Sequence, residues 1–88
     1  MLAYVYVLTS DYGPEGWAVH GVFGSLRRAL AAAKARIAGA YGDWREETDY
    51  ILRRAQKDTS PPHFVVRRWF DGHSVYLEIH RYPITLET

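Results

Sequence analysis

The chain has 88 residues, enough for one domain with a single core, and we expect residues 1–88 to form one domain. Its formal charge of +1 at pH 7 excludes a polyanion that mimics DNA and a strongly basic nucleic-acid coat. The absence of cysteine excludes disulfides, thiolate zinc sites and thiol nucleophiles. An aromatic content of 15% favours a folded protein over a disordered one.

The composition also predicts where the protein resides. No apolar run approaches the ~20 residues that a membrane span requires, and the apolar opening at residues 2–8 has no preceding positive charge. The lack of cysteine fits a reducing compartment. Nine of the eleven basic residues are arginine, a bias typical of GC-rich coding. We therefore expect a cytoplasmic protein of a bacterial cell that makes no contact with a membrane.

The first quarter of the chain predicts two antiparallel strands. Leu2–Thr9 is rich in Tyr and Val and carries apolar side chains on both faces, which favours a strand within a sheet over an edge. Ser10–Gly16 is dense in turn-forming residues and predicts a loop. Trp17–Phe23 predicts the second strand, in which Gly21 marks a bulge or a close approach of the backbone.

A helix is predicted next. Ser25 is a suitable N-cap for a helix that runs to about Ala40 and ends at Gly39 or Gly42. Small and apolar residues follow one stripe at helical spacing, which predicts close packing against a sheet. The members of this stripe are Leu26, Ala29, Leu30, Ala33 and Ile37.

A second helix is predicted after it. Asp43 and Glu46 have the spacing of a capping box, which would open a helix from Trp44 to about Lys57. Its apolar stripe is thin, so an extended conformation for residues 50–55 is the alternative. The prolines that follow Asp58–Ser60 end the segment, because proline cannot continue a helix.

The last part of the chain predicts a β-hairpin over Phe64–Ile84, folded about Asp71-Gly72. An Asp-Gly pair between two β-forming runs is a strong hairpin signal. A two-residue loop would pair Arg68 with Val75 and Trp69 with Ser74, and a four-residue loop would shift these partners but keep the same faces. One face would then be apolar, and the other would be aromatic and charged. The second face would carry Arg67, Trp69, Tyr76, Glu78, His80 and Tyr82.

These elements predict the α+β class, with a four-stranded antiparallel sheet in the order ββααββ and one or two helices packed on one face. The aromatic and charged face would remain partly exposed. Trp, Tyr and Arg are enriched at the centres of protein interfaces, so this face is the candidate partner-binding site. We assign it Arg67, Trp69, Tyr76, Glu78 and Tyr82, with Tyr12 and Trp17 of the first loop as a second contact.

Other interpretations of the same face remain open. Aromatic and arginine side chains on a four-stranded sheet can stack nucleic-acid bases. Alternatively, Arg67 pairs with Glu78 and stacks on Tyr76 as an ordinary cross-strand ladder. On the apolar face, Arg68 would extend its charged end to water or to a carboxylate.

No residues suggest catalysis. The serines occupy turn, cap or strand positions, and no nucleophile elbow, glycine-rich phosphate loop or paired-carboxylate framework is present. His63, His80 and Glu78 could meet as a zinc site, but solvated histidines at a strand end are the more ordinary interpretation. We predict no enzyme activity, no cofactor and no bound metal.

The segment Tyr4–Leu8, a turn-rich loop, and Gly21–Ser25 followed by an Ala/Arg helix resemble small uncharacterised proteins of actinobacteria and their phages. This resemblance covers about the first half of the chain. It implies a ββα start and a phage or accessory-gene origin, and it carries over no catalytic residue. The chain is also similar in size to phage-encoded inhibitors that cover a partner's surface.

The functional hypothesis follows from the aromatic face and the absence of a catalytic motif. We interpret the chain as a non-enzymatic protein-binding module that covers a surface of its partner or associates with itself. The resemblance extends this to a phage-encoded inhibitor or modulator of a host or defence protein. The alternative is a small nucleic-acid-binding domain that uses the same sheet face with the helix arginines.

Overall fold

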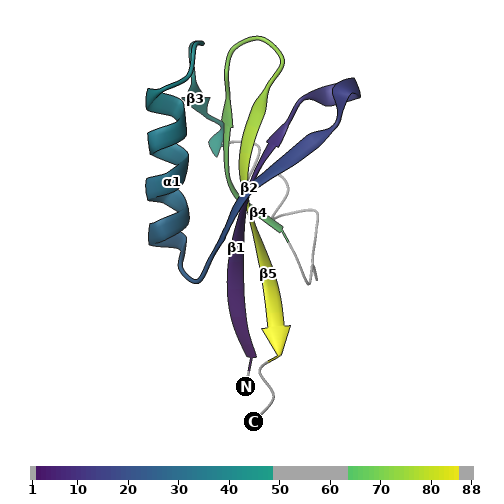
Figure 1. The fold of residues 1–88 in the computed structure, drawn as a ribbon, viewed down its shortest axis with the longest axis vertical. Coiled ribbons are helices and arrows are strands. Elements are labelled where there is room, and N and C mark those ends of the chain that lie inside the picture. Colours follow the sequence, from purple (N-terminus) through teal and green to yellow (C-terminus); the bar gives the residue numbers. More distant parts are fainter. Residues whose placement is uncertain (1, 49–63, 86–88) are drawn as a thin grey trace.

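The computed structural model describes residues 2–48 and 64–85 (Figure 1). Five strands, one α-helix and a short 3-10 turn form within these residues. In chain order they are β1 (Leu2–Asp11), the 3-10 turn (Gly13–Glu15), β2 (Trp17–Phe23), α1 (Leu26–Ala38), β3 (Arg45–Glu46), β4 (Phe64–Phe70) and β5 (Tyr76–Thr85).

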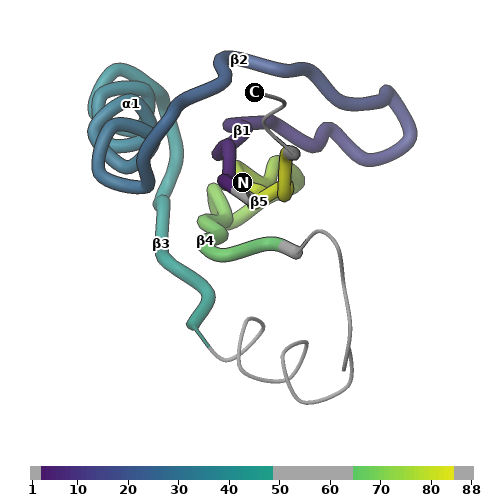
Figure 2. Tube along the Cα trace, turned by 90° about the horizontal axis from the view of Figure 1, so that it is seen from below, coloured from purple at the N-terminus to yellow at the C-terminus, as the bar shows by residue number. Residues whose placement is uncertain are grey.

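The strands form one antiparallel sheet in the order β2-β1-β5-β4-β3. Helix α1 packs on one face of this sheet, against β1, β2 and β5 (Figures 1 and 2). We call this face the helix face and the opposite one the outer face. The predicted four-stranded sheet in the order ββααββ is wrong, because the described residues contain a fifth strand and one α-helix.

Strand β3 replaces the predicted start of a second helix. Its two residues pair with Phe70 and Trp69 of β4. On either side of β3, the Asp43 N–H donates to the Asp71 carbonyl at 3.0 Å and the Glu47 N–H donates to the Arg68 carbonyl at 2.8 Å. These bonds attach the backbone on both sides of β3 to a neighbouring strand and loop, and the thin apolar stripe of the predicted helix would supply little packing energy in favour of a helix. The rest of the predicted helix lies outside the described residues.

Helix α1 forms where the sequence predicts it. The Ser25 side chain accepts a hydrogen bond from the Arg28 N–H at 3.2 Å, and Gly39 is the C-cap. Ala29 and Ala33 are fully buried, so the helix lies close to the sheet. The buried core between α1 and the sheet consists of Leu8, Ala29, Ala33, Trp69, Leu77 and Ile79.

The hairpin of β4 and β5 is present, but its loop differs from the predicted one. The loop contains five residues, 71–75, closed by the Asp71 N–H, which donates to the Val75 carbonyl at 3.1 Å. One oxygen of Asp71, Oδ1, also accepts the N–H groups of His73, Ser74 and Val75 at 2.8–3.0 Å. These bonds stabilise a longer loop than a type I′ turn allows.

The longer loop changes which side chains share a face. Trp69 pairs with Leu77 instead of Ser74, and Arg68 pairs with Glu78 instead of Val75. Because side chains alternate along a strand, this odd shift exchanges the two faces of β4 relative to β5. The predicted faces of the hairpin are therefore wrong for residues 67–70 of β4. A bulge between Val65 and Arg67 changes the register once more.

The pairing of β1 with β2 agrees with the sequence. The bounds of β2 match the predicted strand, and the register shifts opposite Leu8 and Thr9, where Gly21 was expected to mark a bulge. A Cβ atom at Gly21 would lie 2.8 Å from the Phe23 ring, too close for any other residue without movement of that ring. Gly21 thus allows the bulge and the packing of Phe23 together.

The Asp71 loop predicts a pH-dependent contribution to stability. Desolvation raises the pKa of Asp71, but the backbone N–H groups of His73, Val75 and Ser74 outweigh it and hold the pKa below its ordinary value of 3.8. A carboxyl whose pKa is lowered on folding stabilises the folded state above its unfolded pKa, and this is lost as pH falls through the folded pKa.

We therefore expect Asp71→Ala to lower the free energy of unfolding at pH 7 by about 1–2 kcal/mol, as loss of a capping carboxylate does. Urea unfolding at pH 7 and at pH 2.5 measures this, and the gap between wild type and variant should narrow at the lower pH. Asp71→Asn keeps an acceptor oxygen and serves as the control. An equal gap at both pH values would contradict the role given to the charge.

Candidate functional site

A pocket on the outer face contains three of the residues that the sequence analysis assigned to partner binding. Its volume is about 250 Å³, and it spans β2, β1 and β5. It lies opposite α1, because Thr9 pairs with Glu78 while the neighbouring Leu8 pairs with Ile79 in the core. We call it the outer-face pocket. Its lining residues are Thr9, Asp11, Trp17, Glu78, His80 and Tyr82.

Two of the predicted site residues on β4 do not lie on the outer face. Trp69 is only 7% exposed and belongs to the core beneath α1. Arg67 is opposite Ile79, on the helix face, and its Nε lies 2.8 Å from Oε1 of Glu46. The prediction that both join Tyr76 and Glu78 on one face is wrong, because it assumed a loop of two or four residues and the loop has five.

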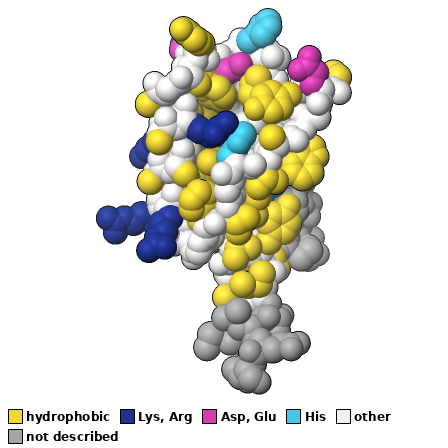
Figure 3. Space-filling view, viewed as in Figure 1, with side chains coloured by type: hydrophobic (Ala, Val, Ile, Leu, Met, Phe, Trp, Pro, Cys, Tyr) yellow, Lys and Arg dark blue, Asp and Glu magenta, His cyan; other side chains and the backbone are white. Residues whose placement is uncertain are grey.

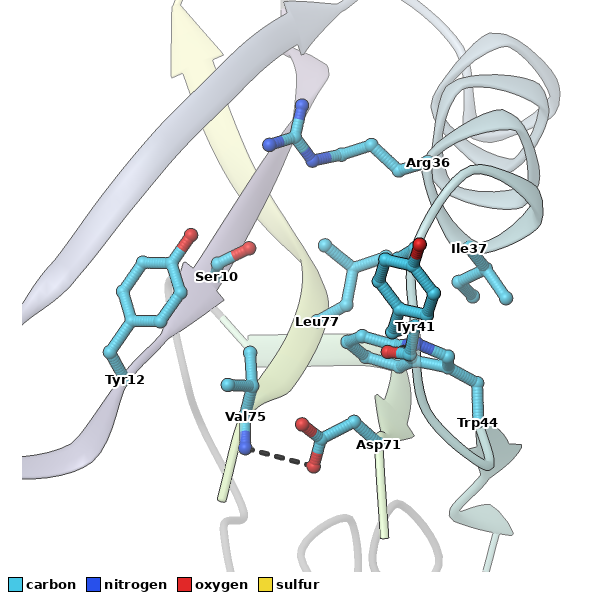
Figure 4. Close-up of a pocket in the computed structure, with 10 residues that line it drawn as sticks. Ser10, Tyr12, Arg36, Ile37, Tyr41, Trp44, Asp71, Val75 and Leu77 are labelled. Carbon is cyan, nitrogen blue, oxygen red and sulfur yellow. Dashed lines mark hydrogen bonds between the residues drawn. The ribbon is translucent and has the colours of Figure 1, made fainter. Parts of the chain in front are cut away.

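The remaining two predicted residues, Tyr76 and Tyr12, do not line the outer-face pocket. Tyr76 is on the outer face, with its ring stacked on Phe70 at a centroid distance of 4.5 Å. The Arg68 guanidinium lies over the same ring, 3.7 Å from its centre. Tyr12 lines a different pocket, on the helix face (Figure 4).

A buried charge network forms the floor of the outer-face pocket. The Glu78 side chain is 12% exposed; its Oε2 lies 3.5 Å from Nε of Arg68 and its Oε1 lies 3.4 Å from Nε2 of His80. Arg68 also lies 3.6 Å from Oε1 of Glu47. The expectation that Arg68 extends from the apolar face is wrong, since it lies on the outer face among carboxylates. Burying the Arg68 guanidinium in this way is tolerated because carboxylates lie close enough to compensate its charge.

The walls of the pocket are aromatic and its rim is acidic. Trp17 is 69% exposed and Tyr82 is 39% exposed, so both present ring surface to a ligand. Asp11 is held at the rim because its Oδ1 accepts the Gly13 N–H at 2.8 Å. Aromatic walls beside a carboxylate suit an apolar or cationic side chain, and they disfavour an anion.

The two edges of the sheet differ in length and chemistry. Strand β2, at one edge, has seven residues and no Asp, Glu, Lys or Arg. Its apolar side chains are exposed at Trp17, at Val19 (50%) and at Val22 (62%). Strand β3, at the other edge, has two residues, both charged. Proteins normally protect a sheet edge with charges or by keeping the edge strand short; β3 has both of these features and β2 has neither.

Hydrophobic and basic side chains are separated on the surface. Figure 3 shows hydrophobic side chains gathered in a band over the strands. Lys and Arg side chains project from the side where Figure 1 places α1. Figure 2 shows β2 on the outer side of β1, at the periphery of the sheet.

The described residues hold no group of three or more His, Asp or Glu side chains arranged for a metal ion. The suggested zinc site of His63, His80 and Glu78 cannot be placed, because His63 lies outside the described residues; His80 and Glu78 are in contact, with Nε2 3.4 Å from Oε1. In the same part of the chain, no helix is long and apolar enough to cross a membrane. Comparison with protein-family models, curated proteins and solved structures found no match to this chain.

Proposed function

We propose that this chain is a protein-binding module that pairs an extended segment of its partner with the outer edge of β2. The observation that carries the proposal is the contrast between the two edges of the sheet. An uncharged, seven-residue edge strand offers a row of backbone donors and acceptors to an incoming strand. The short, charged β3 edge offers no comparable surface.

The outer-face pocket supports the same function. In strand addition, backbone hydrogen bonds supply affinity and pockets for alternate side chains supply specificity. Trp17 belongs both to β2 and to the pocket wall, so a strand paired with β2 would run beside the pocket. Exposed Trp and Tyr side chains are also the kinds of residue that dominate interface energies.

Nucleic-acid binding through the sheet gains less support. Arg67 and Arg68 of β4 lie against the carboxylates of Glu46, Glu47 and Glu78. A phosphate would have to displace those carboxylates. A second copy of the chain, by contrast, is itself a source of an extended segment, so self-association through β2 is one form of the proposed function.

A peptide selection tests the proposal, because it offers many different extended segments to the β2 edge at once. Random 12-residue peptides displayed on phage are selected on the immobilised protein. We expect the enriched peptides to bind wild type and to lose binding to the double variant Val19→Lys/Val22→Lys, because lysines along an edge oppose strand pairing. Both positions are at least half exposed, so the folded state should tolerate the change.

The matched control is Ala35→Lys/Ala38→Lys, which adds the same charge to exposed positions of α1. Peptides should bind this control as they bind wild type. Equal binding to all three proteins, or no enrichment together with a monomeric state at high concentration, would contradict the proposal. Retention of nucleic acid that weakens steeply with salt would favour the alternative function.

A further inference from the structure

A second pocket, of about 230 Å³, lies between the C-terminal end of α1 and the sheet (Figure 4). We call it the helix-end pocket. It does not share a residue with the outer-face pocket. This volume is below the range of about 300–1,000 Å³ that is typical of pockets for drug-sized ligands, so the pocket suits a smaller one such as a single substituted ring.

The pocket has a cation at one end. Arg36 reaches from α1 toward the sheet, on the same side of the pocket as Ser10 and the Tyr12 hydroxyl (Figure 4). No ion pair joins the Arg36 guanidinium to any residue that the structure describes. The one carboxylate of the pocket, Asp71, lies at the opposite end, where its Oδ1 binds three backbone N–H groups of its own loop.

A buried polar pair lies beside the cation. Ser10 is only 4% exposed, and its Oγ is 2.6 Å from Nε2 of His20. Burial and the charge of Arg36 lower the pKa of His20, so the ring is neutral at pH 7. A neutral ring that donates from Nε2 to Oγ leaves the Ser10 hydroxyl free to donate to a ligand. An anionic ligand would select this arrangement of the protons.

The rest of the pocket is apolar. Leu77, Ile37 and Val75 provide aliphatic surface, and Trp44 provides an aromatic wall. The Trp44 indole is fixed in place because its Nε1 donates to the Tyr41 carbonyl at 3.1 Å. An apolar body would therefore be held between the helix end and the sheet, with its charged group directed to Arg36.

We propose that the helix-end pocket binds a small carboxylate that carries an apolar ring. The guanidinium of Arg36 matches a carboxylate with two parallel hydrogen bonds, and the Ser10 hydroxyl supplies a third donor. The ring occupies the space between Trp44 and Leu77. This site does not rest on the proposed pairing at β2, because none of the residues that line the pocket belongs to β2.

The test uses phenylacetate as the probe and follows the amide and indole N–H resonances of the labelled protein by NMR. We expect saturable shifts of the Trp44 indole signal, with a Kd on the order of 1 mM for so small a ligand. Phenylacetamide has the same shape without the charge, and we expect it to bind about tenfold more weakly. Arg36→Gln should weaken phenylacetate binding to the level of the amide.

Arg28→Gln removes an exposed arginine near the other end of α1 and is the matched control. It should bind phenylacetate as wild type does. Equal affinities of wild type for phenylacetate and phenylacetamide would overturn the proposal, and this comparison needs no variant. Absence of shifts at the Trp44 indole up to saturating probe, or unchanged binding by Arg36→Gln, would also overturn it.

Discussion

Replacing Trp69 with alanine is expected to lower the free energy of unfolding by about 3–5 kcal/mol, the range found for large aromatic side chains removed from cores. Trp69 is 7% exposed and packs in the core between α1 and the sheet, with Leu77 opposite it on β5. The cavity left in the variant would be lined by residues of two layers that cannot both move to fill it. Urea unfolding measured by circular dichroism gives the change.

Trp17→Ala is the matched control, because Trp17 is the same residue type in a strand of the same sheet but is 69% exposed. We expect this variant to unfold within about 0.5 kcal/mol of wild type. Similar losses in the two variants would mean that Trp69 is not in the core. The register of β4 with β5, and the assignment of the two faces, would then be wrong.

Glu78→Gln is expected to cost about 2–3 kcal/mol, although the substitution hardly changes the shape of the side chain. It removes the charge from a buried carboxylate and leaves the nearby Arg68, 14% exposed, with one carboxylate fewer. The cost stays below that of an isolated buried pair because Glu47 still lies 3.6 Å from Arg68. Thermal and urea unfolding at pH 7 measure the change.

The control for this variant is Glu46→Gln. The Glu46–Arg67 contact is shorter, at 2.8 Å, but both side chains are about one third exposed. Solvent screening should therefore limit its loss to about 1 kcal/mol or less. If Glu46→Gln were the more destabilising of the two, distance rather than burial would decide the strength of these pairs, and the network beneath the outer-face pocket would contribute little.

Local signals in the sequence predicted local structure well. The Ser25 cap, the Gly39 C-cap and the stripe of small residues between them define α1, because each acts within one or two helical turns. The bounds of β2 and the bulge at Gly21 were likewise predictable from nearby residues. These features do not depend on the pairing of distant strands.

Features set by long-range pairing were not predictable. The Asp71-Gly72 pair indicated a hairpin, but the three hydrogen bonds to Asp71 Oδ1 favour a five-residue loop, and one odd shift in register moved Trp69 into the core. Strand β3 forms through backbone bonds to β4 that no capping-box pattern can reveal.

The candidate site was predicted in part. Trp17, Glu78 and Tyr82 were singled out from residue type, and the structure brings them together around one pocket. Thr9 and Asp11 were missed because they join the site only through the pairing of β1 with β5. The pair of Ser10 and His20 was missed as well, since a turn former and a scattered histidine carry no signal until β1 and β2 are aligned.

The central claim is that β2 accepts a partner strand, and amide hydrogen exchange tests it most directly. The protein is compared free and saturated with the tightest peptide from the selection. Outward-facing N–H groups of an edge strand exchange readily until a new strand pairs with them. We expect the peptide to slow exchange at alternate residues of β2, with α1 and β4 unchanged. Protection confined to α1, or to β3 and β4, with β2 unaffected would contradict the claim.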